Sequence, residues 1–189
     1  RGGCEVEGEI HRVAGGGTGP GNGGAGAAGS IWIIAGTLNG SGYIKANGGS
    51  RSGNPSGGGG RIAVNYTDGN FPVTDVHSSD SNIQAYGGTT YNSAPASPGT
   101  IYVKNIDGDP ANNGSLYVDN NNNTGSVAGL ESGSSYVFNT VNLTRQGALR
   151  VFGSGTNLTV SQGTGLQGDA TAPDLIVDGT LNYTGAAQD

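Results

Sequence analysis

Acidic side chains in one turn-rich stretch are the first candidates for chemistry in this sequence. Asp107 and Asp109 flank a glycine, and Asp119 follows one short apolar run later. Carboxylates in a flexible loop are the hard oxygen ligands that Ca²⁺ prefers, so these three residues are the calcium candidates. Aspartates in turns rich in Asn and Gly also serve backbone hydrogen bonding alone. Calcium is therefore the one cofactor that the sequence suggests, and solvated turn acids are the alternative.

Other ionisable groups give weaker signals. Glu5, Glu7 and Glu9 alternate, so they project from one strand face and repel one another unless a cation lies among them. His11 and His77 have no cysteine or second histidine at ligand spacing, which argues against zinc. Paired carboxylates could catalyse polysaccharide cleavage, but each pair lies in a turn. The sequence therefore predicts no catalytic residue and no enzyme.

Two aromatic residues are candidates for contacts with sugar rings. Trp32 alternates with Ile31 and Ile33, so its ring points outward if the isoleucines point inward. Tyr43 lies at the start of the next apolar run. The alternative is that these rings pack under glycine-rich loops.

Asn-x-Ser/Thr sequons are frequent, and such sequons accept glycans in secreted proteins. The candidate glycosylation sites are Asn39, Asn65, Asn113, Asn122, Asn142, Asn157 and Asn182. The alternative is that Asn, Ser and Thr are simply the preferred outward and corner residues of the fold.

The elements that position these residues are short strands with a repeat of uneven length. Ile31 is followed by Ile62 after 31 residues and by Ile101 after a further 39. A second series begins at Ile10 and has spacings of 34, 39 and 33 residues, through Ile44 and Ile83 to Leu116. Repeats of 20–50 residues are typical of solenoids, in which each unit buries its apolar face on its neighbours.

The sequence therefore predicts an all-β fold, a right-handed parallel β-helix with glycine-rich loops and repeats of about 31–39 residues. No apolar pattern of period 3.6 persists beyond one turn, which argues against helices. A β-sandwich is the competing architecture, but it would not explain the repeats. We expect a single domain over residues 1–189, with regular coils over 1–124 and less regular coils over 125–189.

One part of the chain resembles a known repeat. Residues 24–49 read GAGAAGSIWIIAGTLNGSGYIKANGG, and residues 57–66 read GGGRIAVNY after a further glycine. These stretches resemble the repeats of large secreted microbial surface proteins, and residues 98–104 and 114–121 look like the next coil of that family. The resemblance implies a pectate-lyase-like right-handed β-helix within long adhesin-like or cell-envelope chains, and it implies no reaction.

Composition limits the partners. The 189 residues carry a net charge of −6, with scattered cations, so nucleic acid is not an expected partner. No apolar run approaches the length of a membrane-spanning helix, and Cys4 is the single cysteine, so no internal disulfide forms. The chain begins within a strand–loop unit, which favours a segment of a longer chain.

These observations predict a non-catalytic structural module located outside the cell or on its surface. Its expected partners are like subunits or neighbouring domains, which would contact open strand ends, and also glycans. The sharper hypothesis is end-to-end assembly into a filament. The alternative function is a carbohydrate-binding or polysaccharide-degrading β-helix.

Overall fold

The protein is built from β-strands. The computed structural model describes residues 2–6, 9–11, 23–51, 55–74, 76, 78, 80–89, 96–107, 111–162, 164–169 and 174–184. Within these residues every regular element is a strand and no helix is present. All strand pairs but one among them are parallel. The prediction of an all-β chain with mostly parallel strands is therefore confirmed.

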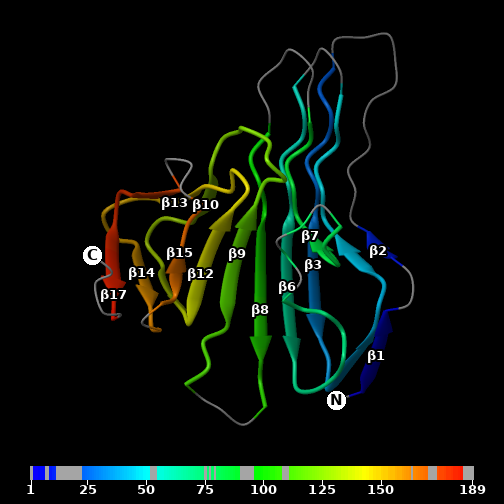
Figure 1. The fold of residues 1–189 in the computed structure, drawn as a ribbon. Coiled ribbons are helices and arrows are strands. Elements are labelled where there is room, and N and C mark those ends of the chain that lie inside the picture. Colours follow the sequence, from blue (N-terminus) through cyan, green and yellow to red (C-terminus); the bar gives the residue numbers. More distant parts are fainter. Residues whose placement is uncertain are drawn as a thin grey trace.

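The strands fall into two groups along the chain. The N-terminal stack consists of β1 (Gly3–Val6), β2 (Glu9–His11), β3 (Ser30–Ile34), β4 (Thr37–Gly40), β5 (Tyr43–Lys45), β6 (Arg61–Tyr66), β7 (Ile83–Gln84) and β8 (Thr100–Asn105). The C-terminal stack consists of β9 (Ser115–Asp119), β10 (Ala128–Leu130), β11 (Ser135–Phe138), β12 (Thr140–Thr144), β13 (Leu149–Val151), β14 (Asn157–Val160), β15 (Leu166–Gln167), β16 (Leu175–Val177) and β17 (Thr180–Tyr183). Figure 1 shows the first strands at one end of the molecule and β17 at the other.

In the N-terminal stack the chain visits three sheets in turn. After β3 it passes through β4 and β5, which belong to two other sheets, and then returns beside β3 as β6. The returning strands align positions at the predicted spacings. The aligned rows are Ile31, Ile62 and Ile101, and Ile10, Ile44 and Ile83. The repeat of 31–39 residues therefore holds in this half, because each coil places its apolar residues over those of the previous coil.

The glycine-rich segments between these strands pack as closely as the strands themselves. Gly49 donates its N–H to Gly26 O at 3.0 Å, Gly57 donates to Gly49 O at 3.0 Å, and Gly88 donates to Gly57 O at 2.9 Å. Four extended segments are thus bonded in series, and Figure 1 shows them running side by side beyond the sheets. A Cβ at Gly57 would overlap the carbonyl oxygen of Gly26, so only glycine allows this approach.

The C-terminal stack follows the same three-sheet order with a shorter repeat. Leu116, Val141 and Leu166 align at a spacing of 25 residues, whereas Leu149 and Leu175 align at 26. Short loops replace the glycine-rich segments here, which is why the spacing falls below 31–39. The sequence analysis described this half as less regular because it searched for the longer period.

The two stacks meet at one antiparallel pair, β8 with β9. Ile101 lies opposite Tyr117 and Tyr102 lies opposite Leu116. The sequence analysis instead placed Leu116 one coil after Ile83, and that register is wrong. The reason lies in β9, which is buried on both faces: Leu116 packs in the C-terminal core, whereas Tyr117 packs in the N-terminal core. A strand with two apolar faces is stable between two cores, not at an outer wall.

This reversal places the two stacks on opposite faces of one shared sheet. The sheet has the order β15-β12-β9-β8-β6-β3. Residues directly opposite in an antiparallel pair point to the same face. Tyr102 therefore points to the side on which the C-terminal core lies, although Ile101 beside it is buried in the N-terminal core.

We expect Gly57→Ala to destabilise the protein. The added methyl group must displace backbone from three neighbouring segments, and overpacking of this kind costs about 1–3 kcal/mol or more. Gly155→Ala is the matched control, because the nearest atom to its Cβ would be Gly133 Cα at 3.8 Å. Urea unfolding followed by circular dichroism measures both variants. Equal midpoints for the two would show that the glycine segments are not closely packed.

Candidate functional site

The predicted calcium ligands are not brought together by the described residues. Asp107 follows the end of β8, and Asp119 is the last residue of β9. Because β8 and β9 are antiparallel, with Ile101 opposite Tyr117, the two aspartates lie at opposite ends of the pair. At about 3.3 Å per residue the separation is roughly 25 Å. Asp109 lies outside the described residues, so no site shared by Asp107 and Asp119 is formed.

Asp119 has a different role. It is 2 % exposed, and its Oδ2 accepts hydrogen bonds from Arg145 Nε at 2.9 Å and Nη2 at 2.8 Å. The other oxygen accepts the N–H of Asn121 at 2.7 Å. Arg145 is held at φ 46°, a conformation that few residues without a β-hydrogen-only side chain adopt, and its contacts offset that strain.

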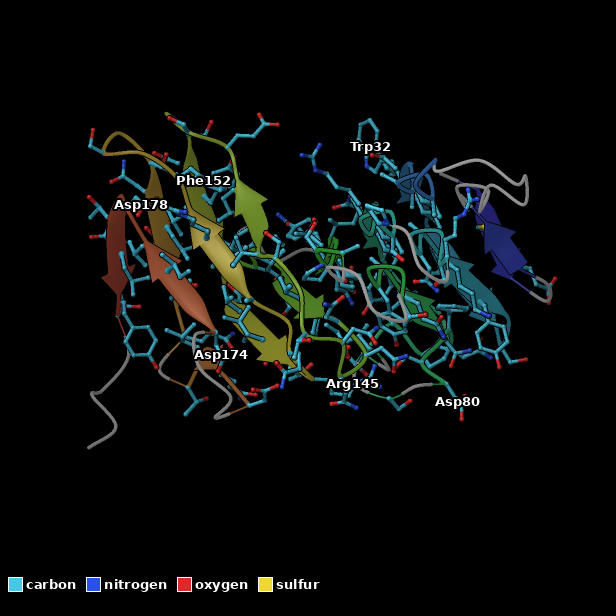
Figure 2. The ribbon with its side chains drawn as sticks, turned by 90° about the horizontal axis from the view of Figure 1, so that it is seen from above. Trp32, Asp80, Arg145, Phe152, Asp174 and Asp178 are labelled. Atoms are coloured by element: carbon cyan, nitrogen blue, oxygen red, sulfur yellow. The ribbon has the colours of Figure 1, made fainter. Side chains whose placement is uncertain are left out.

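Arg145 also joins the two stacks. Its Nη2 donates to Ser78 O at 2.9 Å and to Tyr86 Oη at 2.9 Å, and both partners belong to the N-terminal half. Arg145 and Asp119 belong to the C-terminal half, so this ion pair fixes the junction on the side away from Trp32 (Figure 2). Burial raises the pKa of the Tyr86 phenol, and the Asp119 charge raises it further. Burial lowers the pKa of Arg145, but the hydrogen bond and charge of Asp119 outweigh it and raise that pKa above its usual value.

The other side of the junction carries an aromatic groove. Trp32, Ala63 and Tyr102 are aligned across β3, β6 and β8 and share the outward face of the N-terminal stack. Trp32 is 73 % exposed. Adjacent strands lie about 4.8 Å apart, so the two rings stand roughly 10 Å apart with the small Ala63 between them. This leaves a slot on the sheet surface, open on the side that faces the C-terminal stack.

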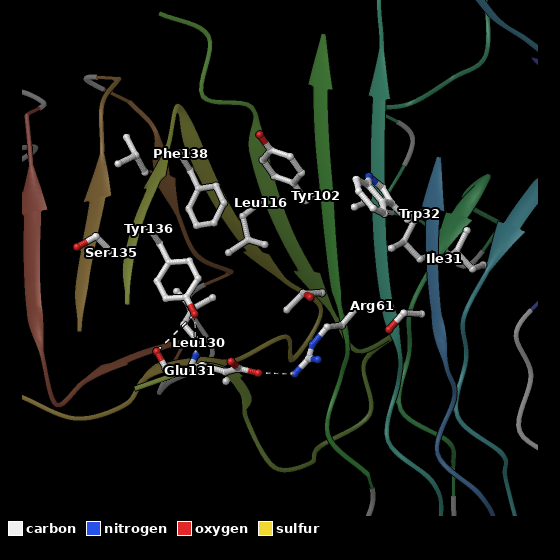
Figure 3. Close-up of a pocket in the computed structure, with 16 residues that line it drawn as sticks. Ile31, Trp32, Arg61, Tyr102, Leu116, Leu130, Glu131, Ser135, Tyr136 and Phe138 are labelled. Carbon is white, nitrogen blue, oxygen red and sulfur yellow. Dashed lines mark hydrogen bonds and ion pairs between the residues drawn. The ribbon is translucent and has the colours of Figure 1, made fainter. Parts of the chain in front are cut away.

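The opposite wall comes from the first coil of the C-terminal stack. Tyr136 and Phe138 project from β11 with ring centroids 6.4 Å apart, and Tyr102 lies 5.9 Å from Phe138. Val137 between them is 45 % exposed. Together the two walls enclose a groove of about 580 Å³ (Figure 3). Burial in this wall raises the pKa of the Tyr102 phenol, which donates its proton to Asn113 O.

One ion pair bridges the rim of the groove. Arg61 Nη2 lies 3.7 Å from Glu131 Oε1, and the two side chains are 67 % and 75 % exposed. Glu131 and Arg61 come from different stacks, so the pair spans the junction (Figure 3). An exposed pair of this kind contributes little stability, but it gives the rim one donor group and one acceptor group with no net charge.

The two predicted sugar-stacking residues do not act together. Trp32 lines the groove, whereas Tyr43 lies on β5 in another sheet. Tyr43 is half-buried, and Lys45 Nζ lies 4.0 Å from its ring centroid, so one face of the ring is occupied. The aromatic partners of Trp32 are instead Tyr102, Tyr136 and Phe138. Alternation along 135–138 already places Tyr136 and Phe138 on one face, but only the reversal at β8–β9 brings them to Trp32.

The sequons differ in accessibility. Asn122 and Asn182 are exposed. Four others are half-buried: Asn39, Asn65, Asn113 and Asn157. Asn142 is buried, and its Nδ2 bonds Thr140 Oγ1 at 3.2 Å, so the structure argues against a glycan there. Asn122 and Asn182 are therefore the positions at which a glycan fits the folded chain.

The remaining candidates contribute no site in the described part of the chain. His77 and Glu7 lie outside the described residues, as do the side chains of Glu9 and His11. In the part that is described, no group of three His, Cys, Asp or Glu side chains is arranged to hold a metal ion. Nor does that part contain a helix long and apolar enough to cross a membrane.

Comparison with known proteins gives no relative. No family model, no curated protein and no solved structure matches the chain. Any statement about function therefore rests on the geometry of the chain itself.

We expect Asp119→Ala to lower the free energy of unfolding by about 3 kcal/mol, because it leaves the Arg145 guanidinium without its counter-ion in a partly buried position. The matched control is Asp178→Ala, which breaks the exposed pair with Arg150. That variant should unfold at the wild-type denaturant concentration. An equal loss of stability in both variants would show that the junction does not depend on the Asp119–Arg145 pair.

Proposed function

We propose that the chain is a right-handed parallel β-helix, interrupted by one reversal, that serves as a non-catalytic structural module of an extracellular surface protein. The observation that carries the proposal is the alignment of apolar positions over successive returns of the chain in both stacks. Each return adds a full set of backbone bonds and buried side chains, so length and stiffness grow with every coil.

The surface chemistry supports an extracellular setting. Only 12 % of the residues are charged, and Gly, Asn, Ser and Thr dominate the loops. Asn122 and Asn182 present sequons on exposed backbone. A polar, charge-poor surface over a continuous backbone ladder suits a module that holds other domains away from the cell.

This location is tested on intact cells that produce the protein. Proteases added outside the cells should release peptides of this chain, detected by mass spectrometry. A cytoplasmic enzyme monitored in the same samples is the control for lysis. Peptides that appear only after the cells are broken would contradict the extracellular part of the proposal.

End-to-end assembly remains part of the proposal, with a restricted geometry. In a joint between copies, β15–β17 cannot stack on β9–β11 of the next copy, because β8 already pairs with the free side of β9. The joint must instead use β1–β3 of the next copy, which are the outer strands of their sheets. Val177 and Leu181, each 36 % exposed, are the apolar groups it would cover.

Sedimentation velocity tests this joint. We expect the mass to rise with protein concentration, and Leu181→Lys to shift the equilibrium toward the monomer by adding a charge at the interface. Trp32→Lys, also exposed but away from these strands, should leave the mass distribution unchanged. A monomer at every concentration would rule out filament assembly.

A further inference from the structure

The strand β11 presents a free edge to the groove. It is the outer strand of the sheet β11-β14-β17. On its paired side, Ser134 O accepts the N–H of Asn157 and Phe138 O accepts the N–H of Ser161. Backbone groups in a parallel ladder alternate between the two sides of a strand. The N–H and C=O groups of Ser135 and Val137 therefore point away from β14.

These groups point over the outward face of the N-terminal stack. The C-terminal sheets end at β10 and β11, whereas the shared sheet continues past β9 into β8, β6 and β3. The groove is the step that results: its floor carries Trp32, Ala63 and Tyr102, and its end wall is β11. A further strand laid beside β11 would occupy the place that the next coil takes everywhere else in the C-terminal stack.

We propose that the groove binds an extended polypeptide segment of another chain, which adds to β11 as a parallel or antiparallel strand. Its backbone bonds the free N–H and C=O groups of Ser135 and Val137. Alternate apolar side chains cover Tyr136 and Phe138, and one of them enters the slot between Trp32 and Tyr102. This inference goes beyond the structural role and does not depend on it.

The size and charge of the groove define the occupant. β11 is four residues long, about 13 Å, and the groove holds about 580 Å³, so a segment of roughly four to six residues fits. A whole second copy does not fit, because a stable protein interface buries about 1,200 Å² or more. The only charged side chains that line the groove, Arg61 and Glu131, already compensate each other, so the matching segment is uncharged between its ends.

An oligosaccharide is the competing ligand, because Trp32 is an exposed aromatic platform. Sugar hydroxyls need several polar side chains around the platform. Around the slot the described lining is mainly apolar, with Leu116, Leu130 and Val137 beside the rings. The unpaired polar groups at its wall belong to the backbone of β11. Strand addition satisfies them, whereas a sugar ring stacked on Trp32 stands across the groove from them.

The single tryptophan makes the groove its own reporter. Trp32 is the only tryptophan in the chain, and it is 73 % exposed. The probe is the peptide acetyl-Gly-Thr-Asn-Leu-Thr-Val-Ser-amide, which copies residues 155–161, the segment that pairs with the other side of β11. Titration of the full chain with this peptide should give a saturable blue shift of the Trp32 emission and protection from iodide quenching.

Two controls separate strand addition from simple apolar contact. The same peptide with N-methyl groups on three consecutive residues cannot donate from either edge, and it should bind at least tenfold more weakly. In the protein, Val137→Pro removes the N–H that points into the groove and should weaken binding about tenfold. Tyr43→Ala, an aromatic truncation on another sheet, should bind like the wild type. If Val137→Pro does not fold, as judged by circular dichroism, the methylated peptide decides alone.

The proposal is overturned by any of three results. The peptide could leave the Trp32 emission unchanged up to millimolar concentration. The methylated peptide could bind as well as the parent, which would remove the backbone pairing. Finally, a neutral oligosaccharide such as cellohexaose could shift the emission where the peptide does not, which would assign the groove to a glycan.

Discussion

Burial of β9 on both of its faces is the constraint on which the arrangement of this molecule depends. Leu116 and Tyr117 are neighbours in sequence but belong to two different cores, so β9 must lie between them. Antiparallel pairing with β8 satisfies that requirement and reverses the direction of the following coils. The two stacks therefore share one sheet but cover opposite faces of it. The groove and the Arg145 junction are the two corners that this offset creates.

Much of the N-terminal stack could be predicted from sequence, and the reason is physical. When coils stack in register, each inward apolar residue must recur at the same point of every coil, so Ile31, Ile62 and Ile101 announce their own alignment. Changes in loop length do not disturb this pattern. The glycines were recognisable as corner residues, but their close mutual packing was not. Contacts such as Gly57 with Gly26 join segments that no periodicity relates.

The functional residues were harder to predict, because each depends on a partner from another coil. Asp119 looks like a calcium ligand in a turn, but Arg145 follows the residue aligned with it one coil later and neutralises it. Trp32 was expected to point outward, and it does. Nothing in the sequence places it opposite Tyr136, because that proximity arises from the reversal at β8 and β9. Local alternation gives the face of a residue, and only the tertiary path gives its neighbours.

The two corners also differ in how completely they are closed. At one corner, Arg145 bonds Asp119, Ser78 and Tyr86, so the polar groups of both stacks are satisfied within the chain. At the other corner, the first coil of the C-terminal stack ends in aromatic rings and a strand edge that the described residues leave without a neighbour. An unpaired edge beside exposed apolar groups is unfavourable in water, and natural sheets usually charge or cover it. Here Ser135 and Val137 carry no charge, and Trp32 stands open beside them. That combination favours a surface that is completed by another chain.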